Sequence, residues 1–260
     1  MCSAPGDDDG PRVVAAVREE ERTLRAGDGA PLREFVAQPA TGFRRGAVLI
    51  IHDVWGYTDF YKDLARRITG QGLAAVLVDF FGRQGDLPEP MRAPEKTGTK
   101  PEAVARAMQR AQQLSDDRFL ADMQTAVDDL RARGAGRVAG WGFCMGGRLA
   151  YLAAARVHGL AGTVAYYGFL QAEPGRLSPL QLASEIKVPL LGVFGGADPG
   201  IPADQIAAFR DALNTDKELV TYPNAPHGFL RYGATAHKAA IDDALARTFR
   251  FLARVLTPPG

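Results

Sequence analysis

The feature that most constrains the fold is a cysteine set between glycines where one apolar segment gives way to another. Residues 140–147 read Gly-Trp-Gly-Phe-Cys-Met-Gly-Gly. The apolar run before them, 138–143, predicts a buried strand, and 145–155 predicts a helix. A nucleophile on a strained strand-to-helix turn needs neighbours without side chains two residues before it and two after it. The pattern therefore predicts a nucleophile elbow that exposes the sulfur of Cys144.

The position of Cys144 also carries chemical consequences. A helix that begins directly behind a thiol favours the thiolate, because the helix N-terminus is the positive end of its dipole. The amide N–H of Met145, the next residue, would point toward a developing oxyanion. The competing interpretation is a buried structural cysteine after a tight turn, since free cysteine is among the most buried residue types. Glycines at both offsets favour the catalytic interpretation.

The rest of the chain alternates apolar runs with helical patterns, which predicts an α/β fold with a mostly parallel central sheet and helices on both faces. We expect a loose tail over residues 1–18 and a single domain over 19–260. A segment rich in Gly, Pro and charge followed by a helix, 82–114, is expected to pass over the sheet as a lid or pocket wall. The predicted strands are 22–25, 32–38, 47–51, 74–81, 138–143, 162–167, 188–195 and 218–222. The predicted helices are 59–69, 101–114, 116–133, 145–155, 202–213 and 234–256.

The acid and base expected of an elbow enzyme follow the nucleophile along the chain. His227 lies in a loop directly after the strand 218–222, where a general base should sit, whereas His158 and His237 are expected in helices as surface or packing residues. Asp198 directly follows another buried strand and is the favoured acid. Asp204 suits the first turn of the next helix instead. Both favoured residues have plainer interpretations, as a loop histidine without a role and as a turn-forming Asp-Pro pair.

Composition excludes several other classes of protein. The chain has 31 Lys and Arg against 30 Asp and Glu, so nothing indicates a nucleic acid or an anionic membrane as partner. Only two cysteines occur, Cys2 and Cys144, which is typical of a reducing compartment. The acidic N-terminus lacks the apolar stretch of a secretory signal, and no run is long enough to span a membrane. We expect a cytoplasmic monomer or small homo-oligomer without a metal or another cofactor.

These motifs resemble the dienelactone hydrolase family, whose members include carboxymethylenebutenolidases. The resemblance covers roughly residues 32–252 and is carried by the elbow, by Asp-Phe-Phe-Gly-Arg at 79–83 and by Pro-His-Gly-Phe-Leu-Arg at 226–231. It implies the α/β-hydrolase fold and a triad of Cys144, Asp198 and His227. It also implies a second oxyanion donor at Val54, beside the Met145 amide.

The resemblance further implies roles for three charged residues. Arg83 and Arg231 match arginines that hold the substrate carboxylate, for which a guanidinium fork is well suited. A single arginine would be better explained by pairing with a surface acid, but two at matching positions favour binding of the substrate carboxylate. Asp53 stands where the family has a glutamate that helps activate the cysteine, and it is shorter by one methylene group. Contact between this acid and the thiol could be lost or made through water, or the acid could bond locally instead.

The sequence thus predicts a thiol hydrolase that cleaves a small carboxylate-bearing lactone or ester through a thioester intermediate. Because a thiolate works best with a good leaving group, amides are expected to be poor substrates. A thiol esterase or thioesterase of the same fold acting on an unrelated substrate is the nearest alternative. A non-catalytic reactive-thiol or redox-sensing protein would not need Asp198. A purely structural or interaction protein would not need any of the triad.

Overall fold

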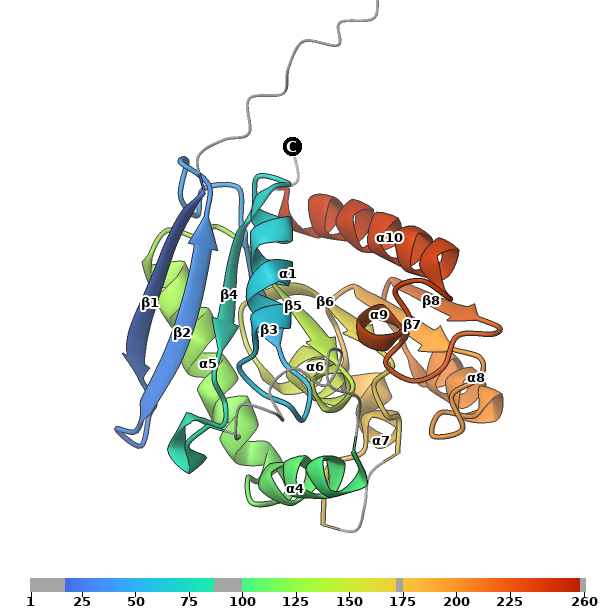
Figure 1. The fold of residues 1–260 in the computed structure, drawn as a ribbon. Coiled ribbons are helices and arrows are strands. Elements are labelled where there is room, and N and C mark those ends of the chain that lie inside the picture. Colours follow the sequence, from blue (N-terminus) through green and yellow to red (C-terminus); the bar gives the residue numbers. More distant parts are fainter. Residues whose placement is uncertain (1–16, 87–99, 172–174, 258–260) are drawn as a thin grey trace, which may run out of the picture.

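A computed structural model describes residues 17–86, 100–171 and 175–257, and they build one eight-stranded sheet (Figure 1). The strand order is β1-β2-β4-β3-β5-β6-β7-β8. The strands are β1 (Arg18–Arg25), β2 (Pro31–Gln38), β3 (Ala47–Ile51), β4 (Ala74–Val78), β5 (Val138–Phe143), β6 (Leu160–Tyr166), β7 (Leu190–Gly195) and β8 (Lys217–Tyr222). From β4 to β8 all neighbours are parallel, whereas β1 and β2 form an antiparallel edge. This is the predicted α/β-hydrolase architecture.

Burial explains why the central strands read as unbroken apolar runs. Every residue of β3, β4, β5 and β7 is buried, because helices cover both faces of the sheet. The helices are α1 (Asp59–Thr69), α4 (Pro101–Gln112), α5 (Asp116–Ala132), α6 (Met145–Arg156), α7 (Pro179–Leu182), α8 (Ala203–Ala212), α9 (Phe229–Tyr232) and α10 (Lys238–Leu256). In Figure 1, α1 and α10 lie on one face of the sheet, and α5 and α6 lie together on the other. The helix α4 lies beyond the carboxyl edge of the parallel strands.

Several predicted boundaries need correction. The strand β1 begins at Arg18, so the expected tail runs one residue too far, and residues 1–16 lie outside the described chain. The fourth strand ends at Val78 rather than at residue 81, because the Asp79 carboxylate accepts a hydrogen bond from the Phe81 amide (3.1 Å) and turns the chain. The last helix begins at Lys238 rather than at residue 234, after the short helix α9. In the predicted excursion, residues 87–99 lie outside the described chain.

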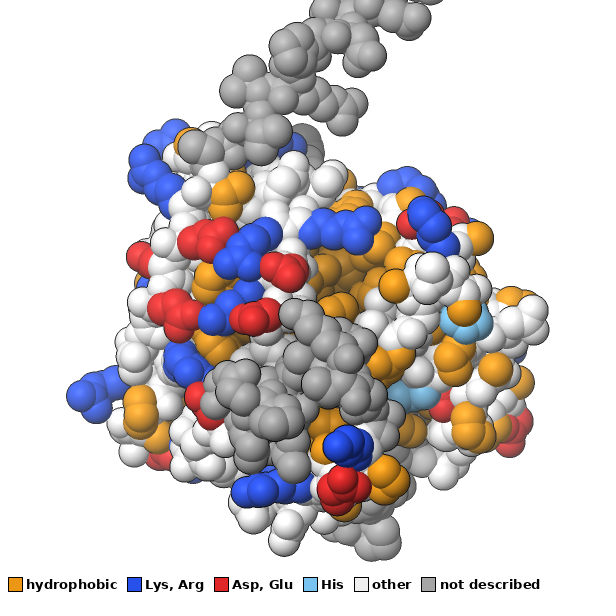
Figure 2. Space-filling view, in the orientation of Figure 1, with side chains coloured by type: hydrophobic (Ala, Val, Ile, Leu, Met, Phe, Trp, Pro, Cys, Tyr) orange, Lys and Arg blue, Asp and Glu red, His pale blue; other side chains and the backbone are white. Residues whose placement is uncertain are grey.

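The surface over β1 and α1 mixes charges of both signs (Figure 2). Lys62 pairs with Glu21 at 2.5 Å, and Arg66 pairs with Glu19 at 2.8 Å, so residues of α1 are tied to the edge strand. Exposed pairs of this kind contribute at most about 1 kcal/mol each. Within the described ranges, no helix combines the length and the apolar character needed to cross a membrane.

One buried carboxylate makes the stability of this edge depend on pH. Glu34 of β2 is 1% exposed, and its nearest cation is the Arg22 guanidinium, with Nε 3.2 Å from a carboxylate oxygen. Burial outweighs this attraction and raises the pKa of Glu34 to about 7. Between the ordinary pKa of a glutamate and pH 7, the folded state keeps a proton that the unfolded state loses. The free energy of unfolding therefore falls as pH rises through this window.

We therefore expect Glu34→Gln to stabilise the protein at pH 8 by up to about 3 kcal/mol, because glutamine stays neutral. At pH 4.5 the variant and the parent should differ little. Urea unfolding at both pH values measures the difference, with exposed Glu102→Gln in α4 as the control. A stability gain of equal size at both pH values, or a loss at pH 8, would contradict the assignment.

Candidate active site

The elbow predicted at Cys144 is present at the junction of β5 and α6. Cys144 has φ 55° and ψ −115°, a conformation that is rare for a residue with a side chain. Its amide donates to the Tyr166 carbonyl oxygen at 3.0 Å, and its carbonyl oxygen accepts from the Arg148 amide at 3.0 Å. These bonds hold the strained turn, and the side chain is partly exposed. The strain presents the sulfur at the carboxyl edge of the sheet.

Two glycines permit this turn by close backbone approach. A Cβ on Gly142 would overlap the carbonyl oxygen of Gly146. A Cβ on Gly146 would overlap the carbonyl oxygens of Ile51 and His52, at the end of β3. The start of α6 is therefore packed directly against the backbone that leads into Val54.

The structure brings the candidate acid Asp198 and the candidate base His227 together. His227 Nδ1 lies 2.6 Å from Asp198 Oδ2, and the other carboxylate oxygen accepts from the Gly200 amide at 2.9 Å. Asp198 is 6% exposed, so its carboxylate has little water to compete with the imidazole. The loops after β7 and β8 carry these two residues to the same edge as Cys144.

The imidazole of His227 is electrostatically coupled to both partners. Burial lowers its pKa, but the hydrogen bond with Asp198 and the neighbouring Cys144 thiol outweigh burial and raise the pKa of His227 to about 10. His227 Nε2 is buried, and no hydrogen bond of full geometry joins it to a described residue. The effect of Cys144 on the pKa of His227 places its thiol within electrostatic reach of the imidazole, although the two do not form an ideal hydrogen bond. The imidazole is therefore set to hold a proton beside the sulfur of Cys144.

Two aromatic rings contact the imidazole of His227. The Phe169 ring stacks on it, with centroids 5.1 Å apart and an interplanar angle of 22°. The Tyr167 ring is tilted by 59° at the same centroid distance. Tyr167 has φ 39°, a second strained position beside the elbow. Face-on aromatic contact favours the charged imidazolium through the ring quadrupole.

The two predicted oxyanion donors lie beside the thiol. Met145 is the first residue of α6, so its amide N–H has no partner inside the helix. Val54 belongs to the loop between β3 and α1, and both residues line the same cavity as Cys144. The contact of Gly146 with the end of β3 fixes the spacing between the two segments.

Asp53 and Arg231 form a buried ion pair with each other. Arg231 Nη1 donates to Asp53 Oδ2 at 2.9 Å, and the arginine side chain is 1% exposed. Asp53 Oδ1 accepts from the Trp55 amide at 2.9 Å, a local bond that shapes the turn around Val54. The pair thus joins the loop that contains Val54 to α9, just after His227. Asp53 was predicted to activate the thiol and Arg231 to bind substrate; here each has the other as partner.

Arg83 is also engaged within the protein. Its two terminal nitrogens donate to the two carboxylate oxygens of Asp122 in α5, at 2.6 and 2.9 Å, and one of them also reaches Asp28 at 3.1 Å. Neither Arg83 nor Arg231 is among the residues that line the cavity at Cys144.

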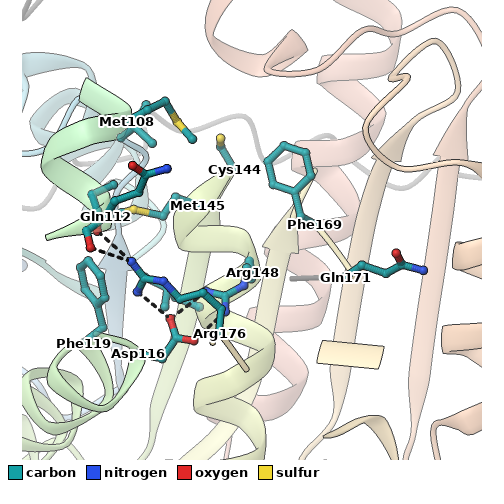
Figure 3. Close-up of a pocket in the computed structure, with 13 residues that line it drawn as sticks. Met108, Gln112, Asp116, Phe119, Cys144, Met145, Arg148, Phe169, Gln171 and Arg176 are labelled. Atoms are coloured by element: carbon teal, nitrogen blue, oxygen red, sulfur yellow. Dashed lines mark hydrogen bonds and ion pairs between the residues drawn. The ribbon is translucent and has the colours of Figure 1, made fainter. Parts of the chain in front are cut away.

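The cavity beside Cys144 has a volume of about 400 Å³, within the range of small-molecule sites. Figure 3 shows Cys144, Phe169 and Met108 at one end, and Arg148, Arg176 and Asp116 at the other. Met108 and Gln112 come from α4, so this helix forms a wall of the cavity. The lining residues are Val54, Met108, Ala111, Gln112, Asp116, Phe119, Cys144, Met145, Arg148, Leu149, Phe169, Gln171 and Arg176.

The cluster at the far end was not predicted from the sequence. Arg148 donates to both carboxylate oxygens of Asp116, at 2.9 and 2.6 Å. Arg176 Nη1 donates to the Leu114 carbonyl oxygen at 2.5 Å, and Nη2 donates to that of Gln112 at 3.0 Å. Arg148 lies one helical turn after Cys144, and this spacing was the one feature of the sequence that could have placed Arg148 near the site. The partners come from distant segments that no sequence period relates.

The residues set aside from catalysis lie away from the triad partners. His158 is exposed after α6, and Asp204 is exposed in the first turn of α8. His237 precedes α10 as its N-cap rather than lying inside it. Among the described residues, no three His, Cys, Asp or Glu side chains gather where they could bind a metal ion.

A family model and the named relatives of this chain indicate the same family. The model of the dienelactone hydrolase family matches residues 32–256. A protein of Saccharolobus solfataricus named "Putative carboxymethylenebutenolidase" is 31% identical over 264 residues, covering 91% of this chain and 99% of that protein. A "Carboxymethylenebutenolidase" of Rhodococcus opacus is 31% identical over 225 residues, covering 81% of each chain.

A solved structure shows the same arrangement of elements. The crystal structure of a "Putative Dienelactone Hydrolase" from Klebsiella pneumoniae superposes with a TM-score of 0.78 at 27% identity. The match covers 92% of this chain and 99% of that one.

Proposed function

This chain belongs to the dienelactone hydrolase family and is a hydrolase of that type, and we propose that it cleaves a small lactone or ester through Cys144, Asp198 and His227. The observation that carries the proposal is the strained elbow that presents the Cys144 sulfur beside an imidazole held 2.6 Å from a buried carboxylate. A structural cysteine would need neither the strain nor the histidine.

The first step forms a thioester. The Cys144 thiolate, paired with the protonated His227, attacks the carbonyl carbon of the substrate. The carbonyl oxygen becomes an oxyanion that accepts hydrogen bonds from the amides of Met145 and Val54. When the carbon–oxygen bond breaks, the enol or alkoxide leaves and takes the His227 proton. The acyl group remains on the sulfur.

The second step releases the acid. His227, now neutral, takes a proton from water as the water oxygen attacks the thioester carbon. Collapse of this second oxyanion expels the Cys144 thiolate and frees a carboxylic acid. Asp198 holds the imidazole in one tautomer and stabilises its cation in both steps. Because the leaving group must depart from a thiolate adduct, enol esters and enol lactones suit this site better than amides.

A thiol-blocking experiment tests the proposal on the unmodified chain. Iodoacetamide should abolish hydrolysis of vinyl acetate, an ester with a small enol leaving group, in proportion to the labelling of Cys144. A Cys2→Ser variant should be inactivated in the same way, which excludes the second cysteine. Full activity in protein fully labelled at Cys144 would refute the proposal.

The role proposed for Asp198 leads to a separate prediction. Asp198→Asn should lower the pKa of His227 from about 10, because the imidazolium loses its carboxylate partner. We expect kcat to fall by about 10³- to 10⁴-fold, since asparagine can also hold the wrong tautomer. NMR titration of the imidazole protons and steady-state kinetics measure the two effects. Asp204→Asn, on the exposed face of α8, is the matched control. An unchanged His227 titration in Asp198→Asn would contradict the assigned pairing.

A further inference from the structure

We infer that His52 is a positioning residue of the oxyanion hole: its imidazole fixes the orientation of the peptide that joins Asp53 to Val54, whose N–H is one of the two proposed oxyanion donors. The inference rests on the proposed function and adds to it a residue outside the triad. His52 lies directly after β3, is fully buried and does not line the cavity at Cys144. It therefore acts through this peptide and not on the substrate.

The two ring nitrogens of His52 bind backbone groups that follow two neighbouring strands, β3 and β4. Nδ1 lies 2.7 Å from the Asp53 carbonyl oxygen, and Nε2 lies 3.3 Å from the Phe80 amide nitrogen. A carbonyl oxygen can only accept a hydrogen bond, and an amide N–H can only donate one. The imidazole therefore carries its proton on Nδ1 and donates it to Asp53. Burial lowers the pKa of His52, which keeps the ring neutral.

The bond to the Asp53 carbonyl sets the direction of the N–H that follows it. The Asp53–Val54 peptide is trans, so its C=O and N–H lie in one plane and point in opposite directions. A buried donor that holds the carbonyl oxygen therefore turns the Val54 N–H the other way, and Val54 lines the cavity beside Cys144. Within the described ranges the Val54 N–H has no hydrogen-bond partner, so it can donate to a substrate oxygen.

The backbone of Asp53 is held by further bonds, and the imidazole is the nearest donor to its carbonyl oxygen. That oxygen also accepts from the Gly56 amide at 3.2 Å, and the Asp53 amide donates to Tyr61 Oη at 3.1 Å. A hydrogen bond to a peptide carbonyl also polarises the N–H of the same peptide. Loss of the His52 donor is therefore expected to weaken Val54 as an oxyanion donor even where the turn itself remains.

His52 also fixes the spacing between the two donor segments. The start of α6, which carries the Met145 amide, packs against the main chain of His52, because a Cβ on Gly146 would lie 2.4 Å from the His52 carbonyl oxygen. The imidazole packs against Phe80 and Phe81, with ring centroids 5.3 and 5.0 Å away. A buried ring packed in this way has little freedom to rotate, so its two hydrogen bonds keep their direction.

Two amide variants separate the roles of the two nitrogens. The amide nitrogen of asparagine branches from Cγ, as Nδ1 of histidine does, whereas the glutamine amide lies one atom farther out, level with Nε2. His52→Asn can therefore still donate to Asp53, whereas His52→Gln replaces only the acceptor for Phe80. We expect kcat and kcat/KM for vinyl acetate to be at least about tenfold lower in His52→Gln than in His52→Asn, with similar KM values, because loss of a whole oxyanion donor costs about 10²- to 10³-fold.

A purely structural role for His52 predicts the opposite order, because asparagine leaves the larger void in the core. Alkylation of Cys144 by iodoacetamide passes through no oxyanion, so its rate should differ little between the two variants. His158→Gln, at an exposed histidine, is the control for loss of an imidazole and should match the parent. Equal kcat values in the two His52 variants, or a lower value in His52→Asn, would overturn the inference.

Failure of the inference is distinguishable from failure of the proposed function. If vinyl acetate is cleaved and iodoacetamide blocks the reaction in the parent, the function holds whatever the two His52 variants do. Nitrogen NMR of the unmodified chain tests the inference without turnover and without a variant: the His52 ring should be protonated on Nδ1 and unprotonated on Nε2. The other tautomer, or a charged ring at pH 7, would overturn the inference even if the enzyme were inactive on vinyl acetate.

Discussion

Replacement of Cys144 by alanine is expected to lower kcat/KM for vinyl acetate by at least about 10⁴-fold, because the nucleophile of a triad acts as a unit with its base. The remaining His227 and Asp198 could at best activate water, without a covalent intermediate. The variant should fold normally, since alanine retains the Cβ and the side chain of Cys144 is only partly buried. Steady-state kinetics and a thermal unfolding curve measure both expectations.

The matched control for this substitution is Cys2→Ala, which removes the other cysteine of the chain. It should retain parental activity. A Cys144→Ala protein that keeps more than a tenth of the parental rate while folded would place the chemistry elsewhere.

Gly146→Ala is expected to destabilise the fold by at least about 3 kcal/mol, although alanine normally stabilises a helix relative to glycine. The reason is the approach of α6 to the end of β3. A Cβ at this position would overlap the carbonyl oxygens of Ile51 and His52, and a carbonyl in a central strand cannot move aside. Relief of the overlap would also shift Val54 away from Met145, so activity should fall with stability.

Urea unfolding compares this variant with Gly136→Ala, in a loop where an added Cβ would meet nothing within 4 Å. The control should lie within about 0.5 kcal/mol of the parent. If Gly146→Ala proved as stable as the parent, the close packing of the elbow against β3 would be refuted.

The elements of the fold that could be predicted from the sequence are those in which apolar residues follow a regular pattern. The central strands bury both faces and so appear as unbroken apolar runs, and their parallel direction follows from strands alternating with helices. The errors occur where a side chain overrides the apolar pattern. Asp79 ends β4 although Phe80 and Phe81, which follow it, are apolar and buried. The edge strand β1 was under-predicted because most of its residues are exposed and charged.

In the candidate site, too, some features could be predicted from the sequence and others could not. That Cys144, Asp198 and His227 lie at one edge was predictable because each follows a strand of the parallel sheet, and the carboxyl ends of parallel strands meet at one edge. The partners of charged residues were not. Asp53 with Arg231, Arg83 with Asp122, and Arg148 with Asp116 each join segments far apart in sequence. A resemblance identifies residue types at positions, whereas the contacts decide whether an arginine faces substrate or protein.

The most direct test of the account is the detection of its covalent intermediate. His227→Ala should slow release of the acyl group, because water then lacks its general base. After this variant is mixed with vinyl acetate and quenched in acid, peptide mass spectrometry should find an acetyl group on Cys144 that hydroxylamine removes. An acetyl group on a different residue, or slow turnover with no adduct at Cys144, would contradict a thioester mechanism.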